Sequence, residues 1–157
     1  MPKKSAGLLV YRKAGDDSGI EVLLVHPGGP FWRNKDDGAW TIPKGEFADD
    51  EQPLNAAKRE FEEELGAAPP EGEYISLKPI KQKNGKIVHA WAAEGSFDPT
   101  GLNSNTFEME WPPKSGRMQK FPEVDRADWF PPEMAKRKML FGQGALVDEL
   151  LTLVQSV

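Results

Sequence analysis

The residues that could do chemistry are concentrated in one acidic stretch, which runs from Glu60 to Glu64 and is interrupted by Phe61. In an α-helix, residues three and four apart share a side, so Glu60, Glu63 and Glu64 would project together. Like charges at these spacings repel, and a bound cation would relieve the repulsion. Carboxylate oxygens suit Mg²⁺ or Mn²⁺, which also bind phosphate oxygens. Because acidic stretches are usually solvated helix faces, these residues alone leave both interpretations open.

The surroundings of the acidic stretch follow a fixed spacing. Five residues separate Gly45 from Glu51, and seven separate Glu51 from Arg59. The pattern has seven positions with a fixed residue type and two apolar positions: Gly45, Glu51, Arg59, Glu60, Glu63, Glu64 and Gly66, with Phe61 and Ala67. Because each fixed type makes up roughly 4–10% of a typical composition, a chance match is on the order of 10⁻⁵ or less.

This pattern is similar to the complete Nudix box of the Nudix hydrolase family, with no departure at any fixed position. Residues 40–45, which lead into it, also resemble the segment before the box in that family. The resemblance implies an α+β fold, a Nudix-type α/β/α sandwich with a mixed central sheet. It also implies a pyrophosphohydrolase that uses Mg²⁺ or Mn²⁺ to cleave a phosphoanhydride bond in a nucleoside diphosphate linked to a group X.

The resemblance implies a set of metal ligands within the box. Glu60, Glu63 and Glu64 match the family's metal-binding carboxylates. Gly45 allows a tight turn, and its carbonyl would approach the same ion. Glu62 falls at a free position of the pattern and is expected to be solvated.

The resemblance also implies catalytic residues. Arg59, a fixed fork of donors, would pair with Glu51 and so orient the acidic cluster. We expect Glu63 and Glu64 to take part in water attack on phosphorus, which requires no nucleophilic side chain. Either Glu64 or Glu123 could act as general base, and the sequence does not assign this role.

Nudix enzymes often add a carboxylate from outside the box, as a metal ligand or base. Glu108, Glu110 and Glu123 are the candidates here. Residues 123–130 resemble the segment in which many members place a glutamate six residues before a tryptophan. Glu123 is therefore favoured as a catalytic and metal-binding residue, with Glu110 as the second choice and a solvated loop glutamate as the alternative.

Substrate contacts are predicted from aromatic and cationic residues near the box. Trp32 and Trp40 could stack on a base beside Arg and Lys residues, or could instead pin their loop to the core. Lys44, Lys114 and Arg117 could meet phosphates, or the last two could solvate a loop.

The substrate is a small-molecule nucleotide on this interpretation. The Pro-Lys-Gly segment, the first two strands and the small size look similar to diadenosine-polyphosphate hydrolases, which favours a dinucleoside polyphosphate or a nucleoside triphosphate. The alternatives are an oxidised nucleoside triphosphate and an ADP-ribose-type sugar nucleotide. A non-catalytic Nudix module that senses a nucleotide is an alternative of another class.

Composition excludes several other classes. A chain of 157 residues suits a single domain over 1–157, and 38% hydrophobic with 29% charged residues suits a soluble protein. No apolar run approaches the roughly 20 residues of a membrane span. The absence of cysteine and of a secretory pattern favours the cytoplasm. A net charge of −5 argues against binding a nucleic-acid polymer.

A helix and several strands must position these residues. Apolar positions three or four apart predict a helix over 51–66, ended by Gly66. A glycine-bracketed turn at 15–19 would join the first two strands into a hairpin. Apolar runs predict strands at 5–12, 20–26, 74–80, 86–93, 106–111 and 127–130, and a second helix at 133–157. His26 and His89 fall in predicted strands, where structural roles are favoured.

Overall fold

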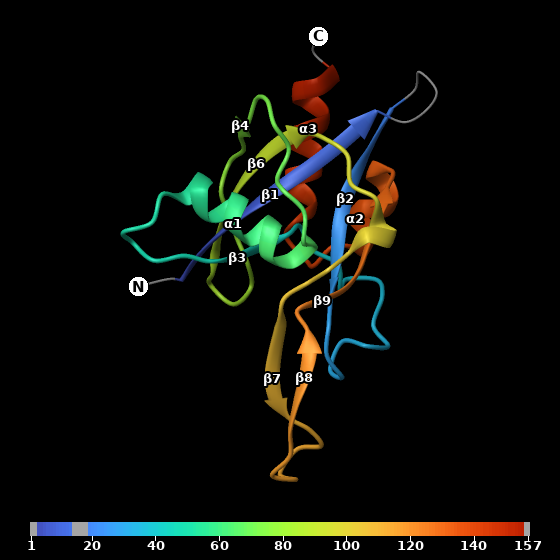
Figure 1. The fold of residues 1–157 in the computed structure, drawn as a ribbon. Coiled ribbons are helices and arrows are strands. Elements are labelled where there is room, and N and C mark those ends of the chain that lie inside the picture. The colour runs from blue at the N-terminus through green and yellow to red at the C-terminus, as the bar shows by residue number, and fades with distance from the viewer. Residues whose placement is uncertain (1–2, 14–18, 156–157) are drawn as a thin grey trace.

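The protein is described by a computed structural model over residues 3–13 and 19–155 (Figure 1). The turn expected at 15–19 lies, except for Gly19, outside the described residues. The strands are β1 (Lys4–Lys13), β2 (Ile20–Pro27), β3 (Lys44–Glu46), β4 (Ile75–Ser76), β5 (Ile80–Lys81), β6 (Ile87–Glu94), β7 (Thr106–Glu110), β8 (Met118–Pro122) and β9 (Val124–Phe130). The helices are α1 (Pro53–Leu65), α2 (Pro132–Lys138) and α3 (Gly144–Gln155), with a 3₁₀ turn at Pro99–Gly101.

The central sheet is mixed, as predicted. Within the described residues it has seven strands, with β4-β6-β1-β2-β9 as its main order and with β3 and β5 beside β1 and β6. The β1–β6 pair is parallel, with Leu8 opposite Trp91. The β1–β2 pair is antiparallel, with Tyr11 opposite Val22, which confirms the predicted hairpin. The remaining pairs of the sheet are antiparallel.

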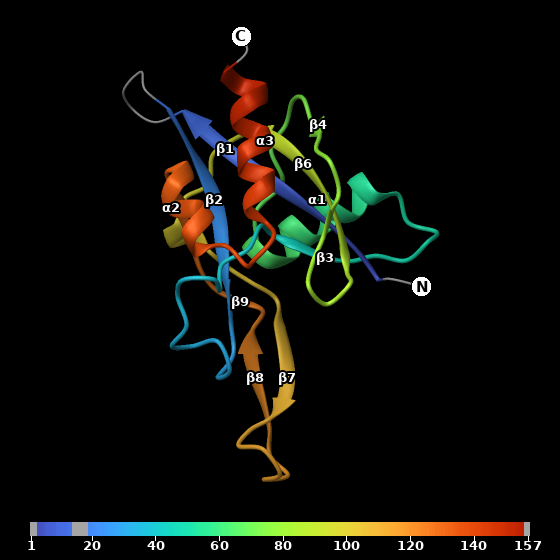
Figure 2. The ribbon, with the colours of Figure 1, turned by 180° about the vertical axis from the view of Figure 1, so that it is seen from behind.

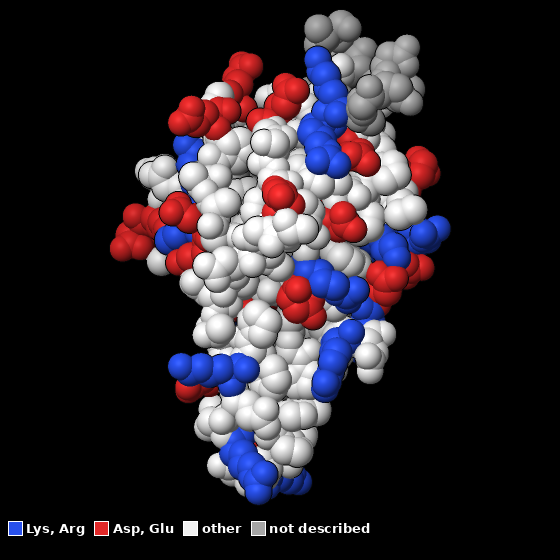
Figure 3. Space-filling model, turned by 45° about the vertical axis from the view of Figure 1, so that its right-hand side comes forward, with Lys and Arg blue, Asp and Glu red and all other residues white. Residues whose placement is uncertain are grey.

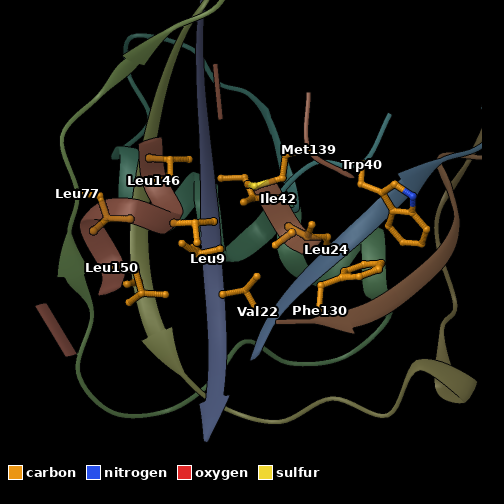
Figure 4. Packing of buried hydrophobic residues seen from close by; sticks show 14 of the residues in the cluster. Leu9, Val22, Leu24, Trp40, Ile42, Leu77, Phe130, Met139, Leu146 and Leu150 are labelled. Atoms are coloured by element: carbon orange, nitrogen blue, oxygen red, sulfur yellow. The ribbon is translucent and has the colours of Figure 1, made fainter. Parts of the chain in front are cut away.

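Helices cover both faces of this sheet, which gives the predicted α/β/α sandwich (Figures 1 and 2). Side chains of a strand alternate between its two faces. Leu8 of β1 therefore packs on the side of α1, where Phe61 and Leu65 are buried. Its neighbour Leu9 packs on the opposite side with Leu146 of α3, and Figure 4 shows this second core.

Local sequence signals explain the bounds of α1. Pro53 occupies the first turn, where its missing N–H is not needed. Gly66 ends the helix in the left-handed conformation, with φ of 73°, and donates its N–H to the carbonyl of Glu62. The helix predicted over 51–66 is thus confirmed to within two residues at each end.

Some predicted elements differ from the structure. The strand expected at 74–80 is two short strands, β4 and β5, because Pro79 cannot donate to the ladder between them. The expected C-terminal helix is two helices, separated by a turn in which Gly142 has φ of 97°. β3 and β8 were not predicted.

The β7–β8 hairpin projects from the sandwich (Figures 1 and 2). It forms a two-stranded sheet of its own, with Phe107 opposite Phe121. Figure 3 shows that this projection is mainly uncharged, with Lys and Arg side chains near its tip. In the described part of the chain, no helix is long and apolar enough to cross a membrane.

Candidate active site

The acidic stretch lies on α1, and Glu60 of this stretch faces Gly45 of β3. Gly45 lies within this paired strand, so the tight turn expected there is not present. Glu60 and Glu64 are buried, each 9% exposed, whereas Glu62 is exposed. Glu63 is half-buried. The helical spacing thus separates one solvated glutamate from the three whose spacing suggested a metal site.

Gly45 of β3 lies against the carboxylate of Glu60. A Cβ atom at residue 45 would lie 2.0 Å from Glu60 Oε1, far inside van der Waals contact. β3 is held there by its antiparallel pairing with β1, in which Gly45 lies opposite Ala6. The absence of a side chain at this position makes room for the buried carboxylate.

Arg59 links the box glutamates. Its Nε and Nη2 atoms donate to Glu51 Oε2 and Oε1 at 2.9 and 3.0 Å, a bidentate pair. Its Nη1 atom donates to Glu60 Oε2 at 2.6 Å and to Glu63 Oε2 at 3.3 Å. The hydrogen bonds with Glu51 and Glu60 raise the pKa of Arg59 further above its ordinary value. The predicted Arg59–Glu51 pair is therefore present.

The carboxylates of the site perturb one another. Burial raises the pKa of Glu64 well above its ordinary value, and the charges of Glu60 and Glu123 raise it further. Burial also raises the pKa of Glu60, with contributions from Glu63 and Glu123, against the opposing hydrogen bond from Arg59. These effects place Glu123 within the electrostatic reach of all three box carboxylates.

Glu123 lies at the junction between β8 and β9. Its N–H donates to the Asn105 carbonyl at 2.8 Å, and its own carbonyl accepts from the Gly28 N–H at 2.9 Å. Burial and the charge of Glu63 raise the pKa of its carboxyl group. The chain thus brings a carboxylate from 60 residues downstream to the face of α1.

The other two candidate carboxylates lie in the β7–β8 hairpin. Glu110 accepts hydrogen bonds from the backbone N–H groups of Lys114 and Gly116 at 2.9 and 3.0 Å, so it stabilises the hairpin loop. Glu108 lies opposite Lys120 on the hairpin. Neither side chain accompanies Glu123 beside the box.

Lys44 adds a cation beside these acids. Its side chain is half-buried, and burial together with the charge of Lys86 lowers its pKa, against the opposing charges of Glu64 and Glu46. Its backbone N–H also hydrogen-bonds to the Glu64 carboxylate. Lys44 therefore places a positive charge beside the Glu64 carboxylate.

Gln143 fixes the segment that leads into β3. It is fully buried in the turn before α3. Its Oε1 accepts from the Ile42 N–H at 3.2 Å, and its Nε2 donates to Thr41 Oγ1 at 2.9 Å. This contact joins the C-terminal part of the chain to the backbone two residues before Lys44.

A cavity of about 470 Å³ opens beside the box carboxylates. Glu64 and Glu123 line one part of it. Aromatic and apolar side chains line the rest, from the loop after β2 and from β7: Phe31, Trp32, Phe107 and Met109. An apolar pocket with a few convergent charged groups is the usual form of a small-molecule site.

The two lining residues on β7, Phe107 and Met109, were not predicted. Phe107 and Met109 are half-buried and alternate with exposed residues on β7. This alternation was the available signal, since it marks one face of the strand as covered. The sequence did not show that the covered face would lie toward the loop after β2, where a Cβ at Gly29 would be 3.0 Å from Phe107.

Four of the five predicted substrate contacts do not line the cavity, Trp32 being the fifth. Lys44 lies beside Glu64 instead. Trp40 is 5% exposed and packs against Phe130 at 5.0 Å between ring centres, so the base-stacking prediction for it is wrong. Its indole N–H donates to Asp36. Lys114 and Arg117 lie in the loop at the far end of the hairpin, away from α1 in both ribbon views (Figures 1 and 2). Trp40 is excluded from the cavity by its burial, and the two cations are kept away from it by the direction of the hairpin. Neither property is encoded by the residues next to these positions in the sequence.

The metal interpretation can be tested on the donor set. In the part of the chain that the structure describes, no three His, Asp or Glu side chains are arranged to bind a metal ion as they stand. Arg59 instead engages Glu60 and Glu63. The residues nevertheless fit a divalent cation, because Glu64 is a buried carboxylate among like charges, and a cation would relieve the cost of its ionisation.

The chain thus places a mixed sheet between helices, with a carboxylate-bearing helix beside a largely apolar pocket. The NUDIX domain model matches residues 1–150. The chain belongs to the NUDIX family and is a pyrophosphohydrolase of that family. Enzymes of this family generally use divalent metal ions.

Solved structures with the same fold include three Nudix proteins. An Ap4A hydrolase from C. elegans, in a binary complex, has a TM-score of 0.64 at 24% identity over 99% of both chains. The NUDIX domain of NrtR from Shewanella oneidensis, complexed with ADP ribose, has a TM-score of 0.62 at 18% identity over 98% of this chain and 89% of that one. The Nudix hydrolase RenU from M. smegmatis has a TM-score of 0.61 at 19% identity over 98% and 86%. No curated protein sequence matches the chain.

Proposed function

We propose that this protein is a divalent-metal-dependent hydrolase of nucleoside diphosphates linked to a group X, with a dinucleoside polyphosphate or nucleoside triphosphate as substrate. The observation that carries the proposal is a cavity with a carboxylate surface on one side and an aromatic surface on the other. Glu64 and Glu123 line it on the side of the box, and Trp32 and Phe107 line it elsewhere. A nucleotide has parts that fit both surfaces: a divalent cation would join its polyanionic chain to the carboxylates, and its planar base would lie against the aromatic rings.

Glu60, Glu63, Glu64 and Glu123 would hold Mg²⁺ or Mn²⁺, with the carbonyl of Gly45. When bound, such ions polarise phosphoryl oxygens and make a coordinated water more acidic. Oxygen donors of this kind select hard cations. The space at residue 45, which a Cβ would close, supports a close approach of backbone and carboxylate.

The side chains have separable roles in this proposal. Arg59 keeps Glu60 and Glu63 on one side of α1 through its fixed donors. Glu64 and Glu123 are the candidates to accept the proton of the attacking water, since burial raises the pKa of both carboxyl groups toward the range useful for a general base. Lys44 would interact with a substrate phosphate beside Glu64.

The base would lie against the aromatic part of the cavity. Phe31 and Trp32 form an edge-to-face pair with ring centres 5.1 Å apart, and Phe107 approaches from the hairpin. Base–aromatic stacking contributes about 1–3 kcal/mol per base and tolerates different bases. The shared fold with an Ap4A hydrolase supports the preference for polyphosphates, whereas that with the ADP ribose complex supports a sugar nucleotide as the second candidate.

A substrate panel tests the proposal. Turnover of diadenosine tetraphosphate, ATP, 8-oxo-dGTP and ADP-ribose is measured with Mg²⁺, with Mn²⁺ and with EDTA. We expect the highest kcat/KM for one of the first two compounds and none in EDTA. Glu63→Gln should lower it by at least about 100-fold, as expected for loss of a metal ligand. Glu62→Gln, an exposed neighbour on the same helix, is the matched control and should stay within about twofold of wild type.

The panel also separates the alternative class. If wild type and Glu63→Gln turned over every compound equally slowly, the hydrolase proposal would be wrong. Tight binding of one compound by both proteins, measured by calorimetry, would then identify a nucleotide-sensing module instead.

A further inference from the structure

His26 is a fully buried histidine at the end of β2, outside the box. Its Nδ1 lies 2.8 Å from Asp125 Oδ1, and its Nε2 lies 2.6 Å from the carbonyl oxygen of Lys35. The Lys35 carbonyl can only accept, so Nε2 donates to it, while Nδ1 lies within hydrogen-bond distance of the Asp125 carboxylate. One imidazole therefore joins three segments of the chain, namely β2, the loop after it and the start of β9.

The two partners of His26 belong to segments that line the cavity. Lys35 follows Phe31 and Trp32, and its Nζ lies 3.8 Å from the centre of the Phe31 ring. Its N–H also donates to the Trp32 carbonyl at 2.9 Å. Asp125 is two residues from Glu123. The His26 side chain thus contacts both the loop after β2 that carries Phe31 and Trp32 (residues 28–40, the aromatic loop) and the segment at the start of β9 (residues 123–126, the Glu123 segment).

A β-bulge turns Asp125 toward His26. His26 pairs with Arg126, but the next residue, Pro27, pairs with Val124, so Asp125 is the extra residue of β9. A bulge of this kind redirects a side chain and often occurs beside active sites. Arg126 Nε also lies 3.6 Å from Asp125 Oδ1, and Trp40 packs edge-on against the imidazole at 5.2 Å. These contacts limit the imidazole to one orientation.

We propose that His26 is a positioning residue that holds the aromatic loop and the Glu123 segment in one fixed arrangement. Binding of the base and placement of the Glu123 carboxylate then both depend on this single buried side chain. This inference rests on the proposed function for its kinetic consequences. Its structural content, that two segments are held by one imidazole, stands without it.

Kinetic constants of three variants test the coupling. Asp125→Ala removes the contact to the Glu123 segment alone, so kcat should fall about tenfold with KM within about twofold of wild type. His26→Leu removes both contacts, so kcat should fall about tenfold and KM should rise about fivefold. Asp125→Ala and His26→Leu both remove the same His26–Asp125 contact, so the double variant should have the same kcat as His26→Leu alone. His89→Leu, at the other histidine, is the matched control and should retain wild-type constants.

A fold defect alone would lower kcat in proportion to the folded fraction and leave KM unchanged. A wild-type KM in His26→Leu, or kcat losses that multiply in the double variant, would therefore overturn the coupling. If His26→Leu does not fold, His26→Gln replaces it. Its amide can serve only one of the two acceptors, so either kcat should fall or KM should rise, and wild-type values of both would overturn the coupling.

Hydrogen exchange tests the inference without activity. In His26→Leu, amide exchange of residues 28–40 and 123–126 should accelerate together, while that of α1 stays unchanged. Acceleration in neither segment, or in one alone, would overturn it. Wild-type protein that turns over no compound of the panel would contradict the proposed function, and the exchange result would still decide the role of His26.

Discussion

The carboxylate of Glu60 occupies the space that a side chain at residue 45 would require. A Cβ atom on Gly45 would lie 2.0 Å from Glu60 Oε1 and 2.1 Å from its Cδ. Because β3 is fixed by its pairing with β1, the backbone at residue 45 cannot easily move away. The glycine at the start of the box is therefore a steric requirement of the buried glutamate on α1.

Gly45→Ala tests this relationship. The added methyl group should displace Glu60 and lower metal-dependent kcat/KM by about 100-fold, as expected for a misplaced metal ligand. Gly101→Ala is the matched control, because no atom lies within 4 Å of its added Cβ. Steady-state kinetics at several Mg²⁺ concentrations measures the effect. Equal kcat/KM for the two variants would contradict the steric interpretation.

Glu64→Gln should stabilise the metal-free protein at neutral pH. The pKa of Glu64 is raised well above its ordinary value of 4.5 by burial and by Glu60 and Glu123. As pH rises from 4.5 toward the raised pKa, the folded state keeps a proton that the unfolded state has lost. The free energy of unfolding therefore falls over this window, and the amide removes that loss.

Thermal unfolding in EDTA at pH values from 4 to 8 measures this effect. The gain in Tm of Glu64→Gln should be largest at high pH and should shrink toward pH 4, where both states are protonated. Mg²⁺ should raise the Tm of wild type more than that of the variant. Glu62→Gln, on the exposed side of α1, should show no such pH-dependent gain. A variant less stable than wild type at pH 8 in EDTA would refute the prediction.

Arg59→Lys should lower activity far more than stability. Lysine has the charge but not the planar fork that bonds Glu51 through two nitrogens and Glu60 through the third. We expect kcat/KM to fall about 10- to 100-fold. The free energy of unfolding should change by about 1 kcal/mol or less, because the Arg59–Glu51 pair is partly exposed. Urea unfolding and kinetics on the same preparation measure both, with Arg137→Lys at a surface pair as control.

Phe107→Ala and Trp32→Ala should weaken substrate binding with little change in kcat. Loss of one stacking surface costs about 1–3 kcal/mol, which corresponds to a rise in KM of roughly 5- to 150-fold. Phe141→Ala, whose ring is 76% exposed and does not line the cavity, is the control. Wild-type KM values in both cavity variants would show that the base binds elsewhere.

Lys114→Ala and Arg117→Ala should leave KM for diadenosine tetraphosphate within about twofold of wild type. β7 separates the hairpin loop from Asn105, which bonds to Glu123, by five residues. Five residues of strand span about 17 Å, beyond the Debye length of about 8 Å at physiological ionic strength. A KM that rose tenfold in either variant would instead place the loop on the substrate, as the sequence suggested.

The parts of the site that could be predicted are those encoded by local spacing. Helical periodicity alone puts Glu60, Glu63 and Glu64 on one side of α1 and leaves Glu62 on another. The Arg59–Glu51 pair was expected from the resemblance to the Nudix box, and the structure contains it. The assignment of metal-ligand roles stays a prediction.

The remaining features depend on contacts between distant segments. Trp40 and Trp32 look alike in the sequence, yet one packs on Phe130 and the other lines the cavity. The positive charges of the hairpin loop looked available to the box, but the direction of the hairpin takes them away. The roles of His26 and Gln143 depend on partners about 100 residues away, which no local pattern reveals.

The hydrogen bonds from Gln143 to Thr41 and Ile42 set an order of events during synthesis. All four candidate carboxylates are in the nascent chain once residue 123 has been added. The contact that fixes the segment before Gly45 forms only when residue 143 has left the ribosome. A chain shortened before Gln143 would therefore contain the whole Nudix box and Glu123. It would still lack the hydrogen bonds that hold the segment before Gly45, the first residue of the box. We expect a chain shortened just before Gln143 to be less active than the full chain for this reason.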